Sequence, residues 1–201
     1  MRDKYFFQII LLSLLIAGCS NSGVSDRKGK SHADWEHQAA KEINPLMLLS
    51  SVINNDLAGV RALLEQEVEV NPLDVDKRSA LMYASYEGYV DIMESLISYG
   101  ADPDLCDVNG RTALMFAASG AFPGAVLMLL EKGAAVNVQD KDEHYTALMY
   151  AAAEGQFENV KLLIEHGADP MIKDVDGDNA LAFARNSNHM ETAEFLEKQM
   201  Q

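Results

Sequence analysis

The sequence predicts an all-α repeat solenoid. The main evidence is a six-residue motif, Ser-Ala-Leu-Met-Tyr-Ala at 79–84, which recurs in similar form three times at intervals of 33, 34 and 33 residues. A second apolar stretch follows every copy, and a glycine follows three of these stretches. A fixed period in this range is typical of a small unit that is copied and stacked. Such a stack exposes one long face and has no natural catalytic pit, so the pattern indicates a binding protein.

The first eighteen residues are predicted to be a signal peptide. Arg2 and Lys4 precede an apolar run over 5–16, and the small pair Ala17 and Gly18 follows. A charged start, a short apolar run and small residues at the cleavage site are typical of a secretory signal. The run is too short to cross a bilayer, which takes about 20 apolar residues.

The end of this segment, Ile16-Ala17-Gly18-Cys19, resembles a bacterial lipobox. The resemblance implies cleavage before Cys19 and lipidation of that cysteine. Several acyl chains anchor a protein stably, because each buried CH₂ contributes about 0.8 kcal/mol. Ser20 resembles the sorting signal of outer-membrane lipoproteins, which predicts a location on the periplasmic face of the outer membrane in the bacterial envelope. The alternative is an ordinary secretory signal with a chance cysteine. Residues 19–34 are polar and are predicted to form a flexible tether.

A degenerate unit precedes the clear copies. Asn44 and Pro45 have the side chains expected at an N-cap and a first helical position. Helices are predicted over 46–53 and 57–65, and the register holds because Leu46 lies 33 residues before Ser79.

Each later unit is predicted to contain two helices. The first helices are predicted over 80–86, 113–119, 147–154 and 180–186, and the second over 90–99, 124–132, 157–166 and 190–198. Side-chain oxygens precede every first helix and are able to cap it; they belong to Ser79, Thr112, Thr146 and Asn179. The pairs Leu96-Ile97, Leu129-Leu130 and Leu162-Leu163 are predicted to point into the stack. The glycines that follow suit the left-handed conformation that ends a helix.

These motifs resemble the ankyrin repeat, above all Thr-Ala-Leu-Met-Phe-Ala-Ala at 112–118 and Leu-Leu-Ile-Glu-His-Gly-Ala-Asp-Pro at 162–170. The resemblance implies two antiparallel helices and a β-hairpin finger per unit. It places about five repeats, at 44–77, 78–110, 111–144, 145–177 and 178–201, in a domain over 35–201 whose outer units act as caps. The usual histidine is replaced by Met82, Met115 and Met149, which shifts cohesion toward alkyl and thioether packing. The extra residue in the third interval lies within 140–145.

Composition limits the partners. The formal charge of -15 argues against nucleic acid, which binds through Lys and Arg. It favours a partner with a basic surface. Two cysteines in different contexts do not form a disulfide framework, and Cys106 remains a free thiol. We expect a monomer or a heterocomplex.

No catalytic motif is visible, so we expect a binding protein without enzymatic activity or cofactor. The five histidines are scattered and form no metal pair. Asp174, Asp176 and Asp178 alternate in a turn, which is compatible with calcium but also with an ordinary finger. No metal site is expected.

The concave face implied by the resemblance would carry one aromatic residue per unit and variable positions beside it, among them Val75, Val108 and Val175. The residues predicted to contact a partner are Arg78, Tyr83, Tyr86, Glu87, Asn109, Arg111, Phe116, Tyr145, Tyr150, Glu154, Asp176 and Phe183. An exposed aromatic row edged by carboxylates is typical of a binding hot spot. The alternative is that the aromatic rings simply pack between neighbouring first helices.

The predicted function is a membrane-tethered protein-binding module. Some ankyrin-repeat lipoproteins that resemble this chain neutralise lipase-type toxins, which implies an immunity protein with a phospholipase partner. Two alternatives remain: a periplasmic stress-protection accessory associated with catalase, and an envelope scaffold. All three rest on architecture and location.

Overall fold

A computed structural model describes residue 44 and residues 46–201. These belong to one compact unit, Ile43–Gln201. The predicted signal peptide, the lipidation site Cys19, the tether over 19–34, the domain start at 35 and the N1 position Pro45 lie outside the described residues. In the described part, no helix has both the length and the apolar content needed to cross a bilayer.

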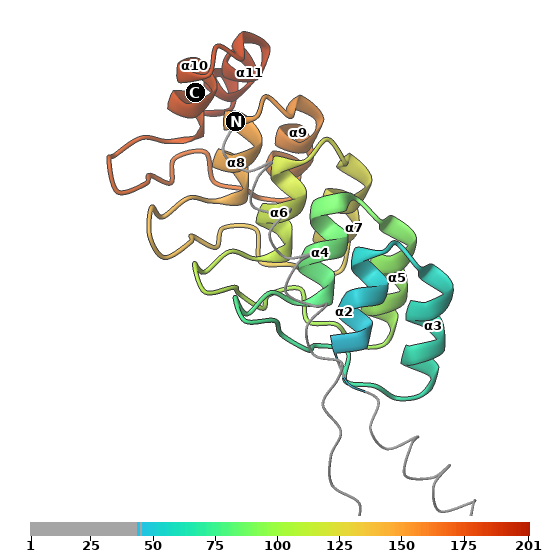
Figure 1. Ribbon diagram of the computed structural model, residues 1–201. Helices are drawn as coiled ribbons and strands as arrows, with labels where there is room; N and C mark the ends of the chain where they lie inside the picture. Colours follow the sequence, from blue (N-terminus) through green and yellow to red (C-terminus); the bar gives the residue numbers. More distant parts are fainter. Residues whose placement is uncertain (1–43, 45) are drawn as a thin grey trace, which may run out of the picture. The chain divides into compact units, whose positions relative to one another are not determined.

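Ten α-helices in the described residues form five pairs (Figure 1). The first helices are α2 (Leu46–Ile53), α4 (Ala80–Glu87), α6 (Ala113–Ser119), α8 (Ala147–Ala153) and α10 (Ala180–Asn186). The second helices are α3 (Leu57–Glu65), α5 (Val90–Ser98), α7 (Pro123–Glu131), α9 (Phe157–Glu165) and α11 (Met190–Gln199). The predicted helices agree with these bounds to within one residue.

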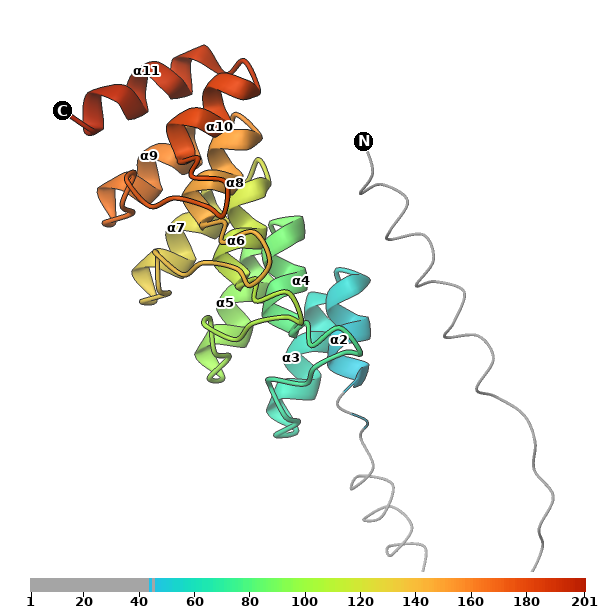
Figure 2. The same ribbon diagram turned by 90° about the vertical axis from the view of Figure 1, so that its left-hand side faces the viewer.

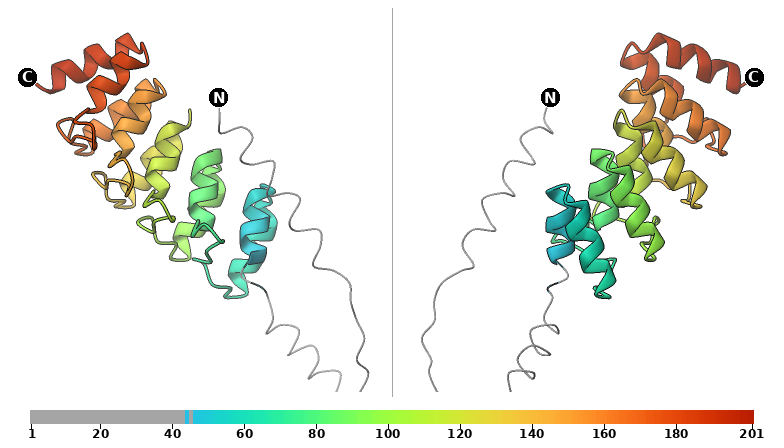
Figure 3. Two further views of the ribbon diagram at one scale, coloured as in Figure 1. Left: turned by 60° about the vertical axis from the view of Figure 1, so that its left-hand side comes forward. Right: turned by 90° about the vertical axis from the view of Figure 1, so that its right-hand side faces the viewer.

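The pairs stack side by side along one direction. First helices pack on the next first helix, and each also packs on its own second helix. The two rows of helices are seen in Figures 2 and 3, and the loops that join successive pairs project together from one side of the stack (Figure 1). The predicted all-α repeat solenoid is confirmed.

The core follows the repeat period. Ala84, Ala117, Ala151 and Ala184 have no exposed surface between successive first helices, where small side chains allow close approach. Leucines fill the same place in three second helices; Leu96, Leu129 and Leu163 have no exposed surface. The prediction for the pair Leu162-Leu163 is therefore off by one residue. Leu162 is only half-buried, and it is Leu163 that matches Leu96.

Asn44 Oδ1 accepts from Leu46 N at 3.0 Å at the start of α2, and the predicted caps form at three of the other four first helices. Ser79, Thr146 and Asn179 accept hydrogen bonds from backbone N–H groups of their helices. Thr112 does not, and its buried hydroxyl has no partner among the described residues. Methionine completes two caps: the N–H of Ser79 donates to Met82 Sδ and that of Thr146 to the matching Met149 Sδ, both at 3.4 Å.

The turn between α6 and α7 departs from the others. Other repeats place a left-handed residue such as Gly88 or Gly155 between their two helices, whereas Gly120 has an extended backbone at φ −88° and ψ 165°. Asn159 of the next repeat compensates, since its buried amide donates to the carbonyls of Ala118 at 3.1 Å and Gly120 at 2.7 Å. One repeat thus completes the backbone hydrogen bonding of its neighbour.

The fingers are turns instead of the predicted β-hairpins. Among the described residues, the one bridge of strand type joins Leu73 and Ser79, and no strand forms. One backbone hydrogen bond closes the base of each finger, for example from Asp107 N to Arg111 O at 3.0 Å, and three fingers add one bond inside the turn, such as that from Gly110 N to Asp107 O at 3.0 Å. So few residues leave no room for the repeated ladder bonds of a hairpin.

Candidate functional site

The loops that project from the stack end in four fingers. We define finger 1 as residues 74–78, finger 2 as 107–111, finger 3 as 140–145 and finger 4 as 174–178. Each begins with an aspartate whose Oδ1 folds its own turn. In finger 1, Asp74 Oδ1 accepts from the N–H groups of Asp76 and Arg78, both at 2.8 Å. Asp107, Asp140 and Asp174 do the same in their fingers. A short acidic side chain thus replaces the missing ladder.

Finger 3 accommodates the extra residue, as predicted. Asp140 Oδ1 accepts from Glu143 N at 3.2 Å and Tyr145 N at 3.1 Å, one position later than in the other fingers. His144 adopts a left-handed backbone at φ 60° in the place that Gly110 and Gly177 fill elsewhere. The insertion therefore changes one tip and leaves the helices in register.

Backbone hydrogen bonds also connect each finger to the next. Val108 N donates to Asp76 O at 2.9 Å, and Lys141 N donates to Asn109 O at 2.8 Å. Val175 N completes the series by donating to the carbonyl of Glu143 at 3.1 Å. We call the surface formed by the four fingers the finger face. Its tips hold fixed positions relative to one another, so it presents a preorganised surface.

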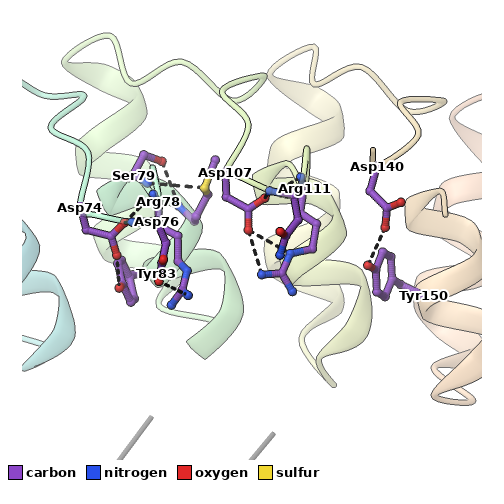
Figure 4. A network of polar contacts seen from close by, with 11 residues as sticks. Asp74, Asp76, Arg78, Ser79, Tyr83, Asp107, Arg111, Asp140 and Tyr150 are labelled. Atoms are coloured by element: carbon purple, nitrogen blue, oxygen red, sulfur yellow. Dashed lines mark hydrogen bonds and ion pairs between the residues drawn. The ribbon is translucent and has the colours of Figure 1, made fainter. Parts of the chain in front are cut away.

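In two fingers the second carboxylate oxygen of the finger aspartate accepts a hydrogen bond from a tyrosine of the helix behind it (Figure 4). The hydroxyl of Tyr83 donates to Asp74 Oδ2 at 2.7 Å, and that of Tyr150 donates to Asp140 Oδ2 at 2.9 Å. Burial, followed by the bond to Asp74, raises the pKa of Tyr83 to about 12. The same causes, in the same order, raise the pKa of Tyr150 above its usual value. Both tyrosines are therefore neutral donors that attach a finger to its first helix.

Finger 2 uses arginine in place of tyrosine. Arg111 Nε lies 2.9 Å from Asp107 Oδ2, and its terminal nitrogen lies 2.8 Å from the same oxygen. The guanidinium carbon lies 4.8 Å from the centre of the Phe116 ring, and Tyr86 meets that ring edge-on at 6.3 Å. The guanidinium thus satisfies the aspartate and covers the phenylalanine in one contact.

The predicted exposed aromatic row is wrong for Tyr83. This side chain is buried, with 6% of its surface exposed, and its hydroxyl reaches back to Asp74. Phe116, Tyr150 and Phe183 are half-buried. The rings thus pack largely between neighbouring repeats, which was the alternative interpretation.

The remaining predicted contact residues are buried, exposed or half-buried. Arg78 is also buried, since it turns to Asp76 at 2.6 Å, so its predicted outward role is wrong. Four predicted residues are exposed: Glu87, Asn109, Glu154 and Asp176. Three more are half-buried: Tyr86, Arg111 and Tyr145. A partner therefore meets finger tips and the rims of the rings more than the ring faces.

Aliphatic tips are the strongest feature that the sequence reasoning undervalued. Val75 is 96% exposed, Val175 is 52% exposed and Val108 is 43% exposed, all directly after a finger aspartate. Leu73, beside finger 1, is 42% exposed and was missed. The signal was the Asp-Val pair at the same place in three units, which packing inside the fold does not require.

Charge is distributed unevenly over the finger face. Arg78 and Lys77 balance the carboxylates of finger 1, and Arg111 balances Asp107 in finger 2. Carboxylates outnumber cations in the other two fingers, which contain Asp140, Asp142, Glu143, Asp174, Asp176 and Asp178. The pKa of Tyr145 in finger 3 is raised first by burial and then by the negative charges of Glu143 and Asp174. One end of the face is therefore apolar and nearly neutral, and the other is acidic.

Catalytic or metal chemistry finds no support at these positions. Within residues 44 and 46–201, no group of three or more His, Cys, Asp or Glu side chains is placed to hold a metal ion. Asp174 instead uses one oxygen for two backbone N–H groups of its own finger. Cys106 is an exposed free thiol. Its partial burial raises its pKa, and the nearby Lys141 opposes this shift without cancelling it. A hollow of about 450 Å³ lies elsewhere, beside Tyr99 and Val68.

Comparison with known proteins agrees with this architecture. Residues 10–107, 99–174 and 125–200 match a family model described as "Ankyrin repeats (3 copies)". The chain is 33% identical to ankyrin repeat protein nuc-2 of Neurospora crassa over 150 residues, which are 74% of this chain and 14% of that protein. It is 44% identical over 100 residues to ankyrin repeat and KH domain-containing protein mask-1 of Caenorhabditis elegans, covering 50% of this chain and 4% of the relative. Human inversin is 31% identical over 141 residues, covering 69% of this chain and 13% of inversin. The chain thus spans a small part of each relative.

Proposed function

The chain belongs to the ankyrin-repeat family, and on that premise we propose that it is a protein-binding module that holds its partner on the finger face while lipidated Cys19 tethers it to a membrane. Proteins built of these repeats are generally interaction modules without catalytic activity. The finger face is the single observation that supports the proposed binding surface. Its tips expose aliphatic side chains in a fixed arrangement, and a soluble protein seldom presents such a row without a use for it.

The proposed location is the periplasmic face of the outer membrane in a bacterial envelope. The lipobox-like residues 16–19 support this location by resemblance. The high negative charge gives the domain no attraction of its own for anionic lipid, so this location depends on the proposed anchor at Cys19.

The proposed partner is a lipase-type toxin, which makes the chain an immunity protein. A tethered inhibitor at the outer membrane meets such a toxin where it enters the cell. The exposed row of valines and the acidic end of the face offer a protein partner apolar contacts and electrostatic steering. This role requires no catalytic residue in the chain.

The test combines binding with protection. The purified full chain in detergent is mixed with a phospholipase-type toxin, sought first in the gene next to its own, and phospholipid hydrolysis in mixed micelles is measured. We expect inhibition. Replacing Val75 and Val108 by Asp should raise the inhibitor concentration needed for half inhibition at least tenfold, because a charge removes apolar contact at two tips. Met190→Asp, on an exposed residue at the start of α11, is the matched control and should change nothing.

Cells supply the second half of the test. Cells expressing the chain should survive sibling cells that deliver the toxin, and Cys19→Ser should reduce this protection by releasing the inhibitor from the membrane. Unchanged sensitivity to the toxin after gene deletion would contradict the immunity role. Peroxide sensitivity of the same deletion strain, with a catalase bound to the chain, would favour the stress-protection alternative.

A further inference from the structure

Finger 4 lacks a donor that every other finger has. Asp174 is 9% exposed, and its Oδ1 accepts from the N–H groups of Asp176 and Asp178 at 3.0 and 2.8 Å. Its Oδ2 receives no donor from any described residue, whereas the equivalent oxygens accept from Tyr83, Arg111 or Tyr150. Among the described residues, this Oδ2 atom is not one of the buried side-chain atoms without a partner, so it is open to the surface and a donor from outside the chain can reach it.

The repeat register explains why the donor is missing. Phe183 stands where Tyr83 and Tyr150 stand, and a phenylalanine has no hydroxyl to donate. The other phenylalanine repeat solves this problem with Arg111, which pairs with Asp107 and covers Phe116. In finger 4 the residue that matches Arg111 is Asp178, an acid. The chain therefore has the carboxylate and the ring of the finger 2 arrangement without its cation.

We propose that finger 4 receives an arginine side chain of the bound protein, whose guanidinium takes the place at Asp174 and Phe183 that Arg111 occupies at Asp107 and Phe116. Finger 2 shows within the same chain that this pairing fits the geometry of the fold. The proposal rests on the proposed function only because it needs a protein partner to supply the arginine.

The surroundings of finger 4 favour a cation. Asp178 and the exposed Asp176 add negative charge beside Asp174. Tyr145 meets Phe183 edge-on, with ring centres 5.0 Å apart, which fixes the ring and presents a second aromatic surface. Lys173, the neighbouring cation in the sequence, forms no ion pair with a described residue. No cation of the described chain therefore fills the position.

Arginine fits this position better than lysine. The guanidinium is planar and donates several hydrogen bonds in one plane, so it pairs with a carboxylate while its flat surface lies over a ring. An ammonium is more strongly hydrated and forms point-like contacts. The Arg111 arrangement uses both properties, with two nitrogens at 2.8 and 2.9 Å from Asp107 Oδ2.

The experiment titrates the full chain in detergent with N-acetyl-arginine amide and follows the backbone amide signals by NMR. We expect saturable shifts at Asp174, Asp176 and Phe183, and no comparable shifts at Asp107 in finger 2. N-acetyl-citrulline amide, a neutral analogue of the same shape, should give none. Equal shifts with both compounds, or none at finger 4, would overturn the proposal.

Two variants fill the position from inside the chain. Phe183→Tyr supplies the hydroxyl found in the tyrosine repeats, and Asp178→Arg supplies the cation found in finger 2. Each should weaken binding of the arginine compound at least tenfold while the melting temperature holds or rises. If one variant fails to fold, the other decides the result, and unchanged arginine binding in a folded variant refutes the site.

Partner capture separates this proposal from the proposed function. If the wild-type chain binds the toxin and Phe183→Tyr binds it equally well, the module function stands and the arginine site fails. If no toxin binds but the arginine compound binds at finger 4, the site stands and the proposed partner fails.

Discussion

Single carboxylates shape the finger face. Asp74 and Asp140 each use one oxygen to fold a turn and the other to accept a tyrosine hydroxyl from the adjoining helix. Hydrogen bonds to a charged acceptor contribute about 1.5–3 kcal/mol each when they are well formed. These side chains thus serve packing and leave recognition to the tips.

The Tyr83 hydroxyl predicts a pH dependence of stability. Its pKa in the folded chain is about 12, above the usual 10, so the fold favours the neutral phenol. A raised pKa contributes stability that is complete below pH 10 and is lost as the pH rises through 12. The wild type should exceed Tyr83→Phe in free energy of unfolding by about 1–2 kcal/mol at pH 9, and this difference should shrink between pH 10 and 12.

Urea unfolding of both proteins at several pH values measures this difference. Tyr99→Phe is the control, because the Tyr99 side chain is half exposed and no described residue bonds its hydroxyl. At pH 9 it should match the wild type. A difference between wild type and Tyr83→Phe that stays constant up to pH 12 would show that the hydroxyl bond does not depend on phenol ionisation.

At the scale of the helix, the caps provide a matched pair. Thr146 Oγ1 accepts from Met149 N at 3.3 Å, whereas the buried Thr112 Oγ1 has no partner among the described residues. Replacing Thr146 by Val should destabilise the chain by about 1 kcal/mol through loss of the cap. The same change at Thr112 should be neutral or stabilising, because it removes a buried hydroxyl that makes no hydrogen bond.

Thermal unfolding followed by circular dichroism measures both cap variants against the wild type. The two positions match in sequence and burial, so helix propensity and side-chain shape cancel in the comparison. Equal losses at Thr112 and Thr146 would show that both hydroxyls cap their helices in solution.

The helices were predictable from the sequence because local chemistry specifies them. Ser79 and Thr146 mark helix starts, and Gly100 and Gly167, both left-handed, mark helix ends. What lies outside each helix was less predictable. The position of Tyr83 combines packing between repeats with a hydrogen bond to an aspartate nine residues earlier, and the local sequence of the helix specifies neither.

The candidate site was predicted only in part for the same reason. Sequence register identified the finger and first-helix positions, but the exposure of each side chain depends on contacts between repeats. Arg78 and Arg111 occupy equivalent positions, yet Arg78 turns to Asp76 and is buried, while Arg111 covers Phe116. Finger 4 could have been found by comparing the repeats, since the change from arginine to Asp178 is visible in the sequence.

Over the whole described stack, stability should fall toward the ends. Among the described residues each repeat contacts only its neighbours, so the outer pairs have one described interface instead of two. Leu181 of α10 is half-buried, whereas the equivalent Leu81, Leu114 and Leu148 are almost fully buried. Hydrogen exchange of the full chain, read by mass spectrometry, should therefore be faster in α2, α3, α10 and α11 than in α6 and α8.

Exchange that is uniform along the stack would contradict this expectation and indicate a single cooperative unit. The central row offers an internal check. Leu114→Ala should create a cavity, cost about 2–5 kcal/mol and accelerate exchange on both sides of α6. The same substitution at Leu181, which has fewer neighbours, should cost less.

The aspartate turns have a consequence for how such a protein can diversify. Because Asp107 and its equivalents set the course of each loop through their own side chains, the side chain of the residue that follows is free of structural duty. Valine occupies that position in three loops and Lys141 in the other, with no change in the helices behind. Ligand preference can therefore evolve through substitutions there, one loop at a time, without eroding the scaffold.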